Sequence, residues 1–190
     1  MFWIHGGANT SGIKDYYDFS ELIRRHEVLV VTINYRLGPL GWFTHPAIQG
    51  LQNGLDKTSN FGTLDIIEAL KWVQKNIKNF GGDPDNITIF GESAGGHNVL
   101  SLLASPLADG LFHKAISQSG YTTSFTIEEA YGSDQKEVPD NKLASDKVLF
   151  SHDLSGYGSI KKLFQSNPQR YGEDYQRYLR SIDGLSLIHI

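Results

Sequence analysis

Apolar residues follow two spacings along this chain, and the two alternate. Short runs that suit an extended backbone predict four strands, at 1–4, 28–33, 86–90 and 114–118. Apolar residues three or four positions apart predict helices in the segments between and after them, at 18–26, 61–79 and 94–104. Strands that alternate with helices predict an α/β fold whose mostly parallel sheet is flanked by helices. The unbroken apolar run at 28–33 predicts a strand buried on both faces.

The other segments lack a clear period. Residues 5–14 and 36–59 are rich in glycine or proline and predict loops, and a loop as long as 36–59 is usually functional. Beyond Tyr121 the apolar period weakens, and polar helical patterns return at 142–150, 160–165 and 171–182. We therefore expect three parts: an α/β core at 1–125, a helical segment at 126–185 that is a candidate cap, and a non-native tail at 186–190.

One stretch of the core carries a chemical motif. Residues 91–95, Gly-Glu-Ser-Ala-Gly, match G-x-S-x-G directly after a predicted strand and before a predicted helix. In this context the motif predicts a nucleophile elbow, where a strained turn lifts the Ser93 hydroxyl clear of the backbone. Gly91 and Gly95 flank the serine because so sharp a turn leaves no room for a Cβ. The pattern also recurs by chance in many loops, so it needs a second element.

That second element lies at the start of the chain. Residues 5–8, His-Gly-Gly-Ala, follow the first predicted strand and match the HGGG-type loop that supplies oxyanion donors in esterases. The helix near Ala94 also directs free N–H groups and its positive dipole end at the space above Ser93. We expect the N–H groups of Gly7, Ala8 and Ala94 to bind the oxyanion that forms when Ser93 attacks an acyl carbonyl.

Several nearby residues have less specific roles. Gly6 and Glu92 are expected to shape the site, although an acidic residue before a helix is equally well explained by the helix dipole. His5 and His97 are expected to pack rather than to catalyse. Asp65 should cap the helix at 61–79 or join an internal ion pair. We expect neither a metal nor a cofactor.

Six stretches occur in the order and at about the spacing seen in one family: 3–7 (WIHGG), 34–38 (NYRLG), 60–65 (NFGTLD), 80–84 (FGGDP), 91–96 (GESAGG) and 118–120 (QSG). Over about residues 1–125 the chain resembles the type-B carboxylesterases, the cholinesterase-like branch of the α/β-hydrolases. The resemblance implies the α/β-hydrolase fold and a serine esterase that acts on small-molecule esters through an acyl-enzyme. Two positions depart from the pattern: Ala8 replaces a third glycine, and His97 replaces a small residue.

The resemblance also implies that part of the active site lies outside this chain. A nucleophilic serine needs a histidine base oriented by a carboxylate, and in the family both lie far downstream of the serine. Formal candidates inside the chain are Glu128, Asp140, Asp153, His113, His152 and His189. Family members also have strands before the position of Met1, so we expect a fragment that is incomplete at both ends and inactive alone. Animal members tend to carry disulfides, so the lack of cysteine suggests a bacterial source.

Composition narrows the partners. The 190 residues carry a formal net charge of −4 and no cysteine, which excludes thiol catalysis and zinc–thiolate sites. The acidic balance argues against nucleic acid, and no apolar run is long enough for an integral membrane segment. Nothing in the sequence indicates an oligomeric state or a cellular compartment. Two hypotheses follow: a serine esterase, with thioesterase, amidase and lipase as neighbouring readings, or a binding or adhesion domain that lost catalysis. The retained Ser93 favours the esterase.

Overall fold

The computed structural model describes residues 1–44, 49–50, 52–127 and 130. These fall into two compact units. The first comprises residues 1–37 and 62–123, and the second comprises residues 38–61 together with residues from 124 onward. Most of the predicted cap at 126–185, with its three predicted helices, and the whole predicted tail at 186–190 lie outside the described residues.

The first unit is built on a parallel sheet. Its strands are β1 (Phe2–Ile4), β2 (Val31–Thr32), β3 (Thr88–Glu92) and β4 (Lys114–Gln118). They lie in the order β2-β1-β3-β4, and each neighbouring pair is parallel. Trp3 of β1 therefore lies between Thr32 of β2 and Phe90 of β3. These pairings confirm the predicted parallel sheet, and each strand overlaps its predicted segment.

The second strand differs from its prediction. The run 28–33 was expected to form a strand buried on both faces, but β2 is two residues long and only half-buried. Leu29, just before it, has 38% of its surface exposed. Among the described residues β2 pairs with β1 alone, so it forms one edge of this sheet and lacks a second neighbour to cover it. The prediction of full burial is therefore wrong.

The helices follow the apolar period closely. They are α1 (Ser20–Arg25), α2 (Gly38–Gly41), α4 (Phe61–Asn76) and α5 (Ala94–Ala104), with 3₁₀ turns η1 (Gly54–Thr58), η2 (Ile77–Phe80) and η3 (Pro106–Ala108). Together α4 and η2 cover the predicted helix 61–79, and α5 has the bounds predicted for the helix at 94–104. The short α2 and η1 interrupt the predicted loop 36–59. Within α1, Ile23 is 45% exposed, although it belongs to the apolar spacing that predicts a helix at 18–26.

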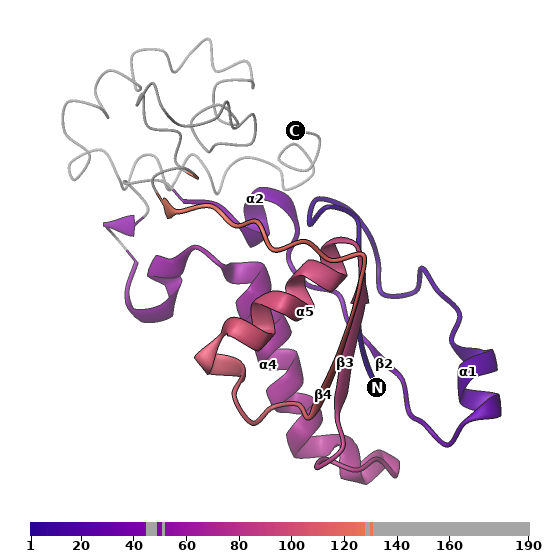
Figure 1. Cartoon of the computed structure of the whole chain (residues 1–190). Helices are drawn as coiled ribbons and strands as arrows, with labels where there is room; N and C mark the ends of the chain where they lie inside the picture. The colour runs from indigo at the N-terminus through magenta and orange to yellow at the C-terminus, as the bar shows by residue number, and fades with distance from the viewer. Residues whose placement is uncertain (45–48, 51, 128–129, 131–190) are drawn as a thin grey trace, which may run out of the picture. The chain divides into compact units, whose positions relative to one another are not determined.

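The helices cover the sheet from two sides. Figure 1 shows α4 and α5 on one side of the strands and α1 on the other. On the α1 side, Trp3 packs edge-on against Phe19 with ring centroids 5.4 Å apart, and Phe19 also contacts Phe90. Phe19 precedes α1, which explains why α1 itself buries no residue. The core between sheet and helices contains Ile66 and Leu70 of α4, both fully buried.

The strand order determines where a ligand can bind. From β1 the chain moves outward to β2, and from β3 it moves the other way to β4. The carboxyl ends of β1 and β3 therefore lie side by side at a switch point, where open α/β sheets form their ligand crevices. The loop that starts at His5 leaves β1 at this point, and Ser93 follows β3 at the same point.

The second unit contributes short elements only. An isolated antiparallel bridge joins Trp42 to Asn60. The Gln49 side chain donates from Nε2 to the Thr44 hydroxyl at 2.8 Å, and this bond links the two ends of a gap in the described residues.

Candidate active site

Ser93 occupies a strained turn between β3 and α5. Its backbone has φ 54° and ψ −119°, a conformation that costs a non-glycine residue about 1–3 kcal/mol. Its N–H donates to the Gln118 carbonyl at 2.9 Å, and its own carbonyl accepts from the His97 N–H at 2.9 Å. The side chain makes no capping bond to α5. The backbone is thus fixed by two hydrogen bonds while the half-buried hydroxyl is left for other partners.

Two glycines allow this turn to lie against β1. A Cβ added to Gly95 would lie 2.0 Å from the Ile4 carbonyl oxygen and 2.8 Å from that of His5. A Cβ added to Gly91 would lie 2.7 Å from the same Ile4 oxygen. Real Cβ atoms do not approach backbone so closely, so only glycine permits this contact between α5 and β1. At Gly91 the nearest obstacle is the backbone of Gly95 across the turn, 2.5 Å away, which agrees with the predicted reason, whereas at Gly95 the obstacle is β1 and not the turn itself.

The start of α5 is also held on the β4 side. The Ser117 hydroxyl donates to the Gly96 carbonyl at 3.0 Å, and a Cβ on Gly96 would lie 2.7 Å from the Gln118 oxygen. One turn after the serine, the Nδ1 atom of His97 lies 2.5 Å from the Tyr121 carbonyl, and the two rings stack 4.3 Å apart. His97 thus packs against the segment after β4, as expected.

The loop after β1 has an unusual backbone. Gly7, Ala8 and Asn9 follow one another with φ of 109°, 54° and 59°, all in the left-handed half of conformational space. The Gly7 carbonyl accepts from the N–H groups of Thr10 and Ser11, both at 3.0 Å. Such a run is unfavourable for L-residues unless the surroundings hold it. The loop must therefore be fixed from outside.

Part of the predicted site comes together around Gly6. A Cβ on Gly6 would lie 2.7 Å from the Glu92 carbonyl oxygen, 3.1 Å from its Oε2 and 3.2 Å from the Ser93 Cβ. The loop therefore begins in contact with the elbow, and the Glu92 carboxylate lies beside it. Among the described residues, three N–H groups next to this contact donate to no protein acceptor: Gly7, Ala8 and Ala94.

Side chains from outside the HGGA motif hold the two ends of the loop. The Tyr35 hydroxyl donates to the His5 carbonyl at 2.5 Å, and the two rings stack 4.4 Å apart. At the far end, Nδ2 of Asn98 on α5 donates to Oδ1 of Asn9 at 2.9 Å. Tyr35 and Asn98 are 5% and 2% exposed, and burial raises the pKa of the Tyr35 phenol well above its ordinary value. Neither the elbow motif nor the HGGA motif indicates a site role for Tyr35, Asn9 or Asn98.

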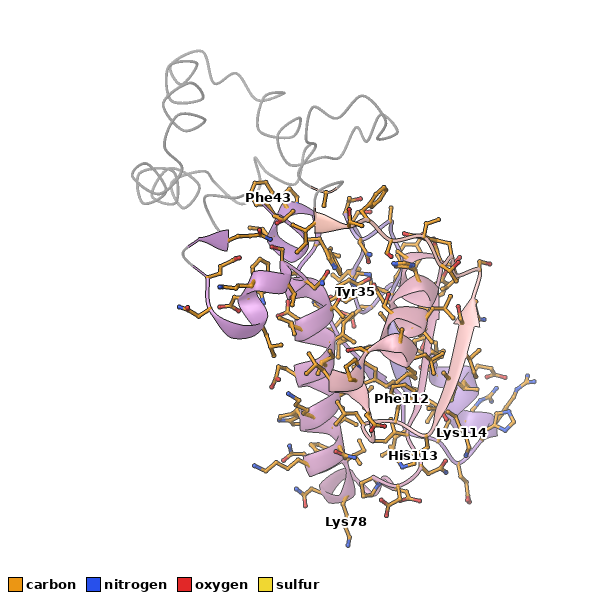
Figure 2. The ribbon with its side chains drawn as sticks, turned by 60° about the vertical axis from the view of Figure 1, so that its left-hand side comes forward. Tyr35, Phe43, Lys78, Phe112, His113 and Lys114 are labelled. Carbon is orange, nitrogen blue, oxygen red and sulfur yellow. The ribbon has the colours of Figure 1, made fainter. Side chains whose placement is uncertain are left out.

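His113 lies away from the elbow. Its Nδ1 accepts from the Ile87 N–H at 3.1 Å, just before β3 begins, whereas Ser93 follows the other end of β3. Figure 2 shows His113 at the opposite end of the strands from Tyr35. Its role is structural, and it is not a base for Ser93. The other five candidates for a triad inside the chain lie outside the described residues: Glu128, Asp140, Asp153, His152 and His189.

Asp65 forms the predicted internal ion pair. Its carboxylate accepts from the Arg36 N–H at 3.0 Å and from the guanidinium at 2.7 and 2.8 Å. Desolvation raises the pKa of Asp65, but the hydrogen bonds and the charge of Arg36 outweigh it and lower that pKa below its ordinary value. The pair joins the start of α4 to the segment that follows Tyr35.

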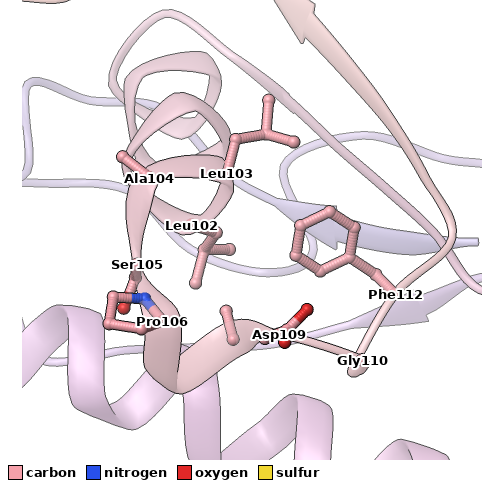
Figure 3. Close-up of a pocket in the computed structure, with 9 residues that line it drawn as sticks. Leu102, Leu103, Ala104, Ser105, Pro106, Asp109, Gly110 and Phe112 are labelled. Carbon is pink, nitrogen blue, oxygen red and sulfur yellow. The ribbon is translucent and has the colours of Figure 1, made fainter.

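Three further features bear on what the described residues could bind: metal-ligating groups, membrane-spanning helices and hollows. In the described parts of the chain, no three His, Cys, Asp or Glu residues are grouped so that they could hold a metal ion. No described helix is both long enough and apolar enough to cross a membrane. A hollow of about 420 Å³ lies at the far end of α5 from Ser93, between Leu102, Pro106 and Phe112 (Figure 3).

Comparison with known proteins gives consistent matches. A model of the carboxylesterase family matches residues 1–145. The para-nitrobenzyl esterase of Bacillus subtilis (strain 168) is 50% identical over 132 residues, which cover 68% of this chain and 26% of that protein. The cocaine esterase of Homo sapiens is 52% identical over 120 residues, which cover 63% and 20%. A solved structure of a PNB esterase superposes with a TM-score of 0.61 at 49% identity, covering 67% and 27%. The chain thus spans about a quarter of the length of such relatives.

Proposed function

This chain belongs to the carboxylesterase family (type B) and has the α/β-hydrolase fold, and on that premise we propose that it is the nucleophile-bearing part of a serine carboxylic-ester hydrolase. The observation that carries the proposal is the contact between two elements from distant parts of the sequence. Gly6 lies against Ser93, so the loop with free N–H groups borders a serine held in a strained turn. Small-molecule esters are the substrate class that suits this arrangement, as the names of the relatives indicate for those proteins.

The reaction proceeds in two steps. Ser93 Oγ gives its proton to a histidine base and bonds to the acyl carbon, and the carbonyl oxygen becomes an oxyanion. The N–H groups of Gly7, Ala8 and Ala94 stabilise that charge, and loss of one such donor typically lowers the rate by about 10²- to 10³-fold. The alcohol leaves with a proton from the histidine, and water then hydrolyses the acyl-enzyme by the same route. Glu92 shapes the site through its carboxylate beside the loop.

The histidine and its carboxylate come from outside this chain. Among the described residues the Ser93 hydroxyl forms no hydrogen bond with a histidine side chain, and the chain spans about a quarter of the length of its relatives. The elbow and the oxyanion loop therefore provide one half of a catalytic site. A binding or adhesion domain without catalysis fits less well, because such a domain has no need for a strained serine beside free N–H groups.

The test is Ser93→Ala in the complete enzyme that contains these residues. The variant should lose turnover of a p-nitrophenyl ester and labelling by a fluorophosphonate, while its unfolding free energy stays close to that of the parent. Ser101→Ala is the matched control, because among the described residues the Ser101 hydroxyl bonds only to the His97 carbonyl, within α5. Near-normal turnover by Ser93→Ala would refute the assignment.

Residues 1–190 alone should show no sustained turnover. Without a base, Ser93 retains only the modest residual catalysis that an oxyanion hole and binding provide. The purified chain is to be incubated with a short-chain activated ester and with a fluorophosphonate. Stoichiometric labelling at Ser93 together with sustained turnover would mean that an internal base exists, and His152 would be the first residue to examine.

A further inference from the structure

The oxyanion loop is tied at both ends by side chains that no catalytic motif contains. At its start the Tyr35 hydroxyl holds the His5 carbonyl, and at its end Asn98 holds the side chain of Asn9. The amide pair is reciprocal, since Nδ2 of Asn9 also lies 3.5 Å from Oδ1 of Asn98. Asn9 Oδ1 lies 3.5 Å from the Tyr35 hydroxyl as well, so the two ties meet.

The residues between these two hydrogen-bonded ends have a backbone conformation that needs support from outside the loop. Between them lie Gly6, Gly7 and Ala8, and the φ angles from Gly7 to Asn9 are all positive. No regular secondary structure fixes this stretch, so its N–H directions depend on where its ends are held. Asparagine tolerates the left-handed region better than most residues, which suits Asn9 to its place.

Asn98 belongs to the helix that carries the nucleophile. It lies on α5 five residues after Ser93, and its side chain is buried. Its Nδ2 donates to Oδ1 of Asn9, and the Asn98 side chain also interacts with the Tyr35 hydroxyl, which itself holds the start of the loop. One rigid element thus sets the position of the serine and, through one amide pair, the position of the loop.

We propose that Asn9 and Asn98 are positioning residues, whose amide pair fixes the distance between the Ser93 hydroxyl and the N–H groups of the oxyanion loop. The inference rests on the proposed esterase function and adds two residues to it. Neither amide touches the substrate. The pair acts by holding the N–H donors of the loop where the oxyanion forms. These donors stabilise the transition state and not the bound ester.

The experiment is a double-mutant cycle in the complete enzyme, with Asn9→Ala, Asn98→Ala and the double variant. Each single change should lower kcat for a p-nitrophenyl ester by between about tenfold and 10²-fold, because small misplacements of catalytic groups cost that much. KM should stay within about twofold, since ground-state binding is not affected. The double variant should be about as slow as the slower single variant, because the two changes break one interaction.

A transition-state analogue provides a readout that a purely structural role would not move. Affinity for a trifluoromethyl ketone, which forms an oxyanion on the serine, should fall by the same factor as kcat/KM. Ser101→Ala on the same helix should leave kcat, KM and this affinity unchanged. Unchanged kcat in the single variants, with only a lower melting temperature, would overturn the proposal. So would effects that multiply in the double variant.

Two arrangements keep the outcome decisive. If Asn98→Ala does not fold, Asn9→Ala still tests the pair, because Asn9 is only half-buried in a loop. Ser93→Ala is assayed in parallel. Full turnover by Ser93→Ala would refute the esterase proposal and this inference together, whereas an inactive Ser93→Ala beside normal amide variants would refute the amide pair alone.

Discussion

Replacing Gly95 by alanine sets two effects of opposite sign against each other. Inside a helix, glycine to alanine normally stabilises by about 0.8–1.0 kcal/mol. Here the new Cβ would lie 2.0 Å from the Ile4 carbonyl oxygen, so α5 and β1 must separate by about 1 Å to reach an allowed contact. Overpacking of this kind costs about 1–3 kcal/mol of stability. The backbone of a central strand can move aside less easily than a side chain can. We expect the steric term to win and the free energy of unfolding to fall by about 2 kcal/mol.

The same separation should damage catalysis. β1 leads into the oxyanion loop, and α5 begins directly after Ser93, so movement between these elements misplaces the serine relative to the loop. A displacement of about 1 Å typically costs about 10²-fold in rate, which we expect in kcat/KM for a p-nitrophenyl ester. Urea unfolding of the complete enzyme gives the stability term. Ser101→Ala on the same helix is the control, because among the described residues its hydroxyl bonds only to the His97 carbonyl within α5. A Gly95→Ala variant that is as stable and as active as the parent would refute the contact.

Two further predictions concern the loop and the Arg36–Asp65 pair. Gly7→Val should abolish most turnover, because φ is 109° at Gly7 and a Cβ there would lie 2.3 Å from the backbone of the same loop. Ala8→Gly should be tolerated, because glycine readily adopts the φ of 54° found at Ala8. Equal turnover in the parent and both variants would contradict this prediction. Asp65→Asn should lower the unfolding free energy at pH 7 by about 1 kcal/mol or less. Because Arg36 lowers the pKa of Asp65, that contribution is complete above the ordinary value of 3.8 and is lost as the pH falls through the lowered value. Urea unfolding from pH 7 to pH 2 checks whether parent and variant converge; a constant difference would exclude the ion pair as its cause.

The sequence predicts those parts of the fold that depend on neighbours along the chain. The helix at α4 follows from Ile66, Leu70 and Val73 at helical spacing, and all three are buried. The sequence predicts more burial for the β2 segment than the structure shows. The burial of a strand depends on which strands lie beside it, and its own residues do not reveal those neighbours. Ile23 shows the same limit: its spacing was helical, but Phe19, outside α1, makes the contact with the sheet.

The candidate site divides in the same way. The elbow and the HGGA loop were recognisable because each is a short motif directly after a predicted strand. The motifs did not reveal which segments exclude a Cβ at Gly6 and Gly95, namely the elbow and β1. The pairing of Asn9 with Asn98 could not, because the two residues are 89 positions apart and meet only through the packing of α5 on β1. One signal was present in the sequence: Asn98 lies beside Val99 on the apolar face of α5, where a polar side chain requires a partner.

The strain at Ser93 itself predicts how two inactive variants should differ. Ser93→Ala and Ser93→Gly both remove the hydroxyl, so both should lack turnover. Only glycine relieves a turn at φ 54° and ψ −119°, which costs other residues about 1–3 kcal/mol. Glycine loses about 0.5–1 kcal/mol of that gain through the entropy of its unfolded chain. The glycine variant should therefore be more stable than the alanine variant by about 1 kcal/mol in urea unfolding. If the alanine variant is the more stable one, the turn is not strained, and the orientation of the nucleophile needs another explanation.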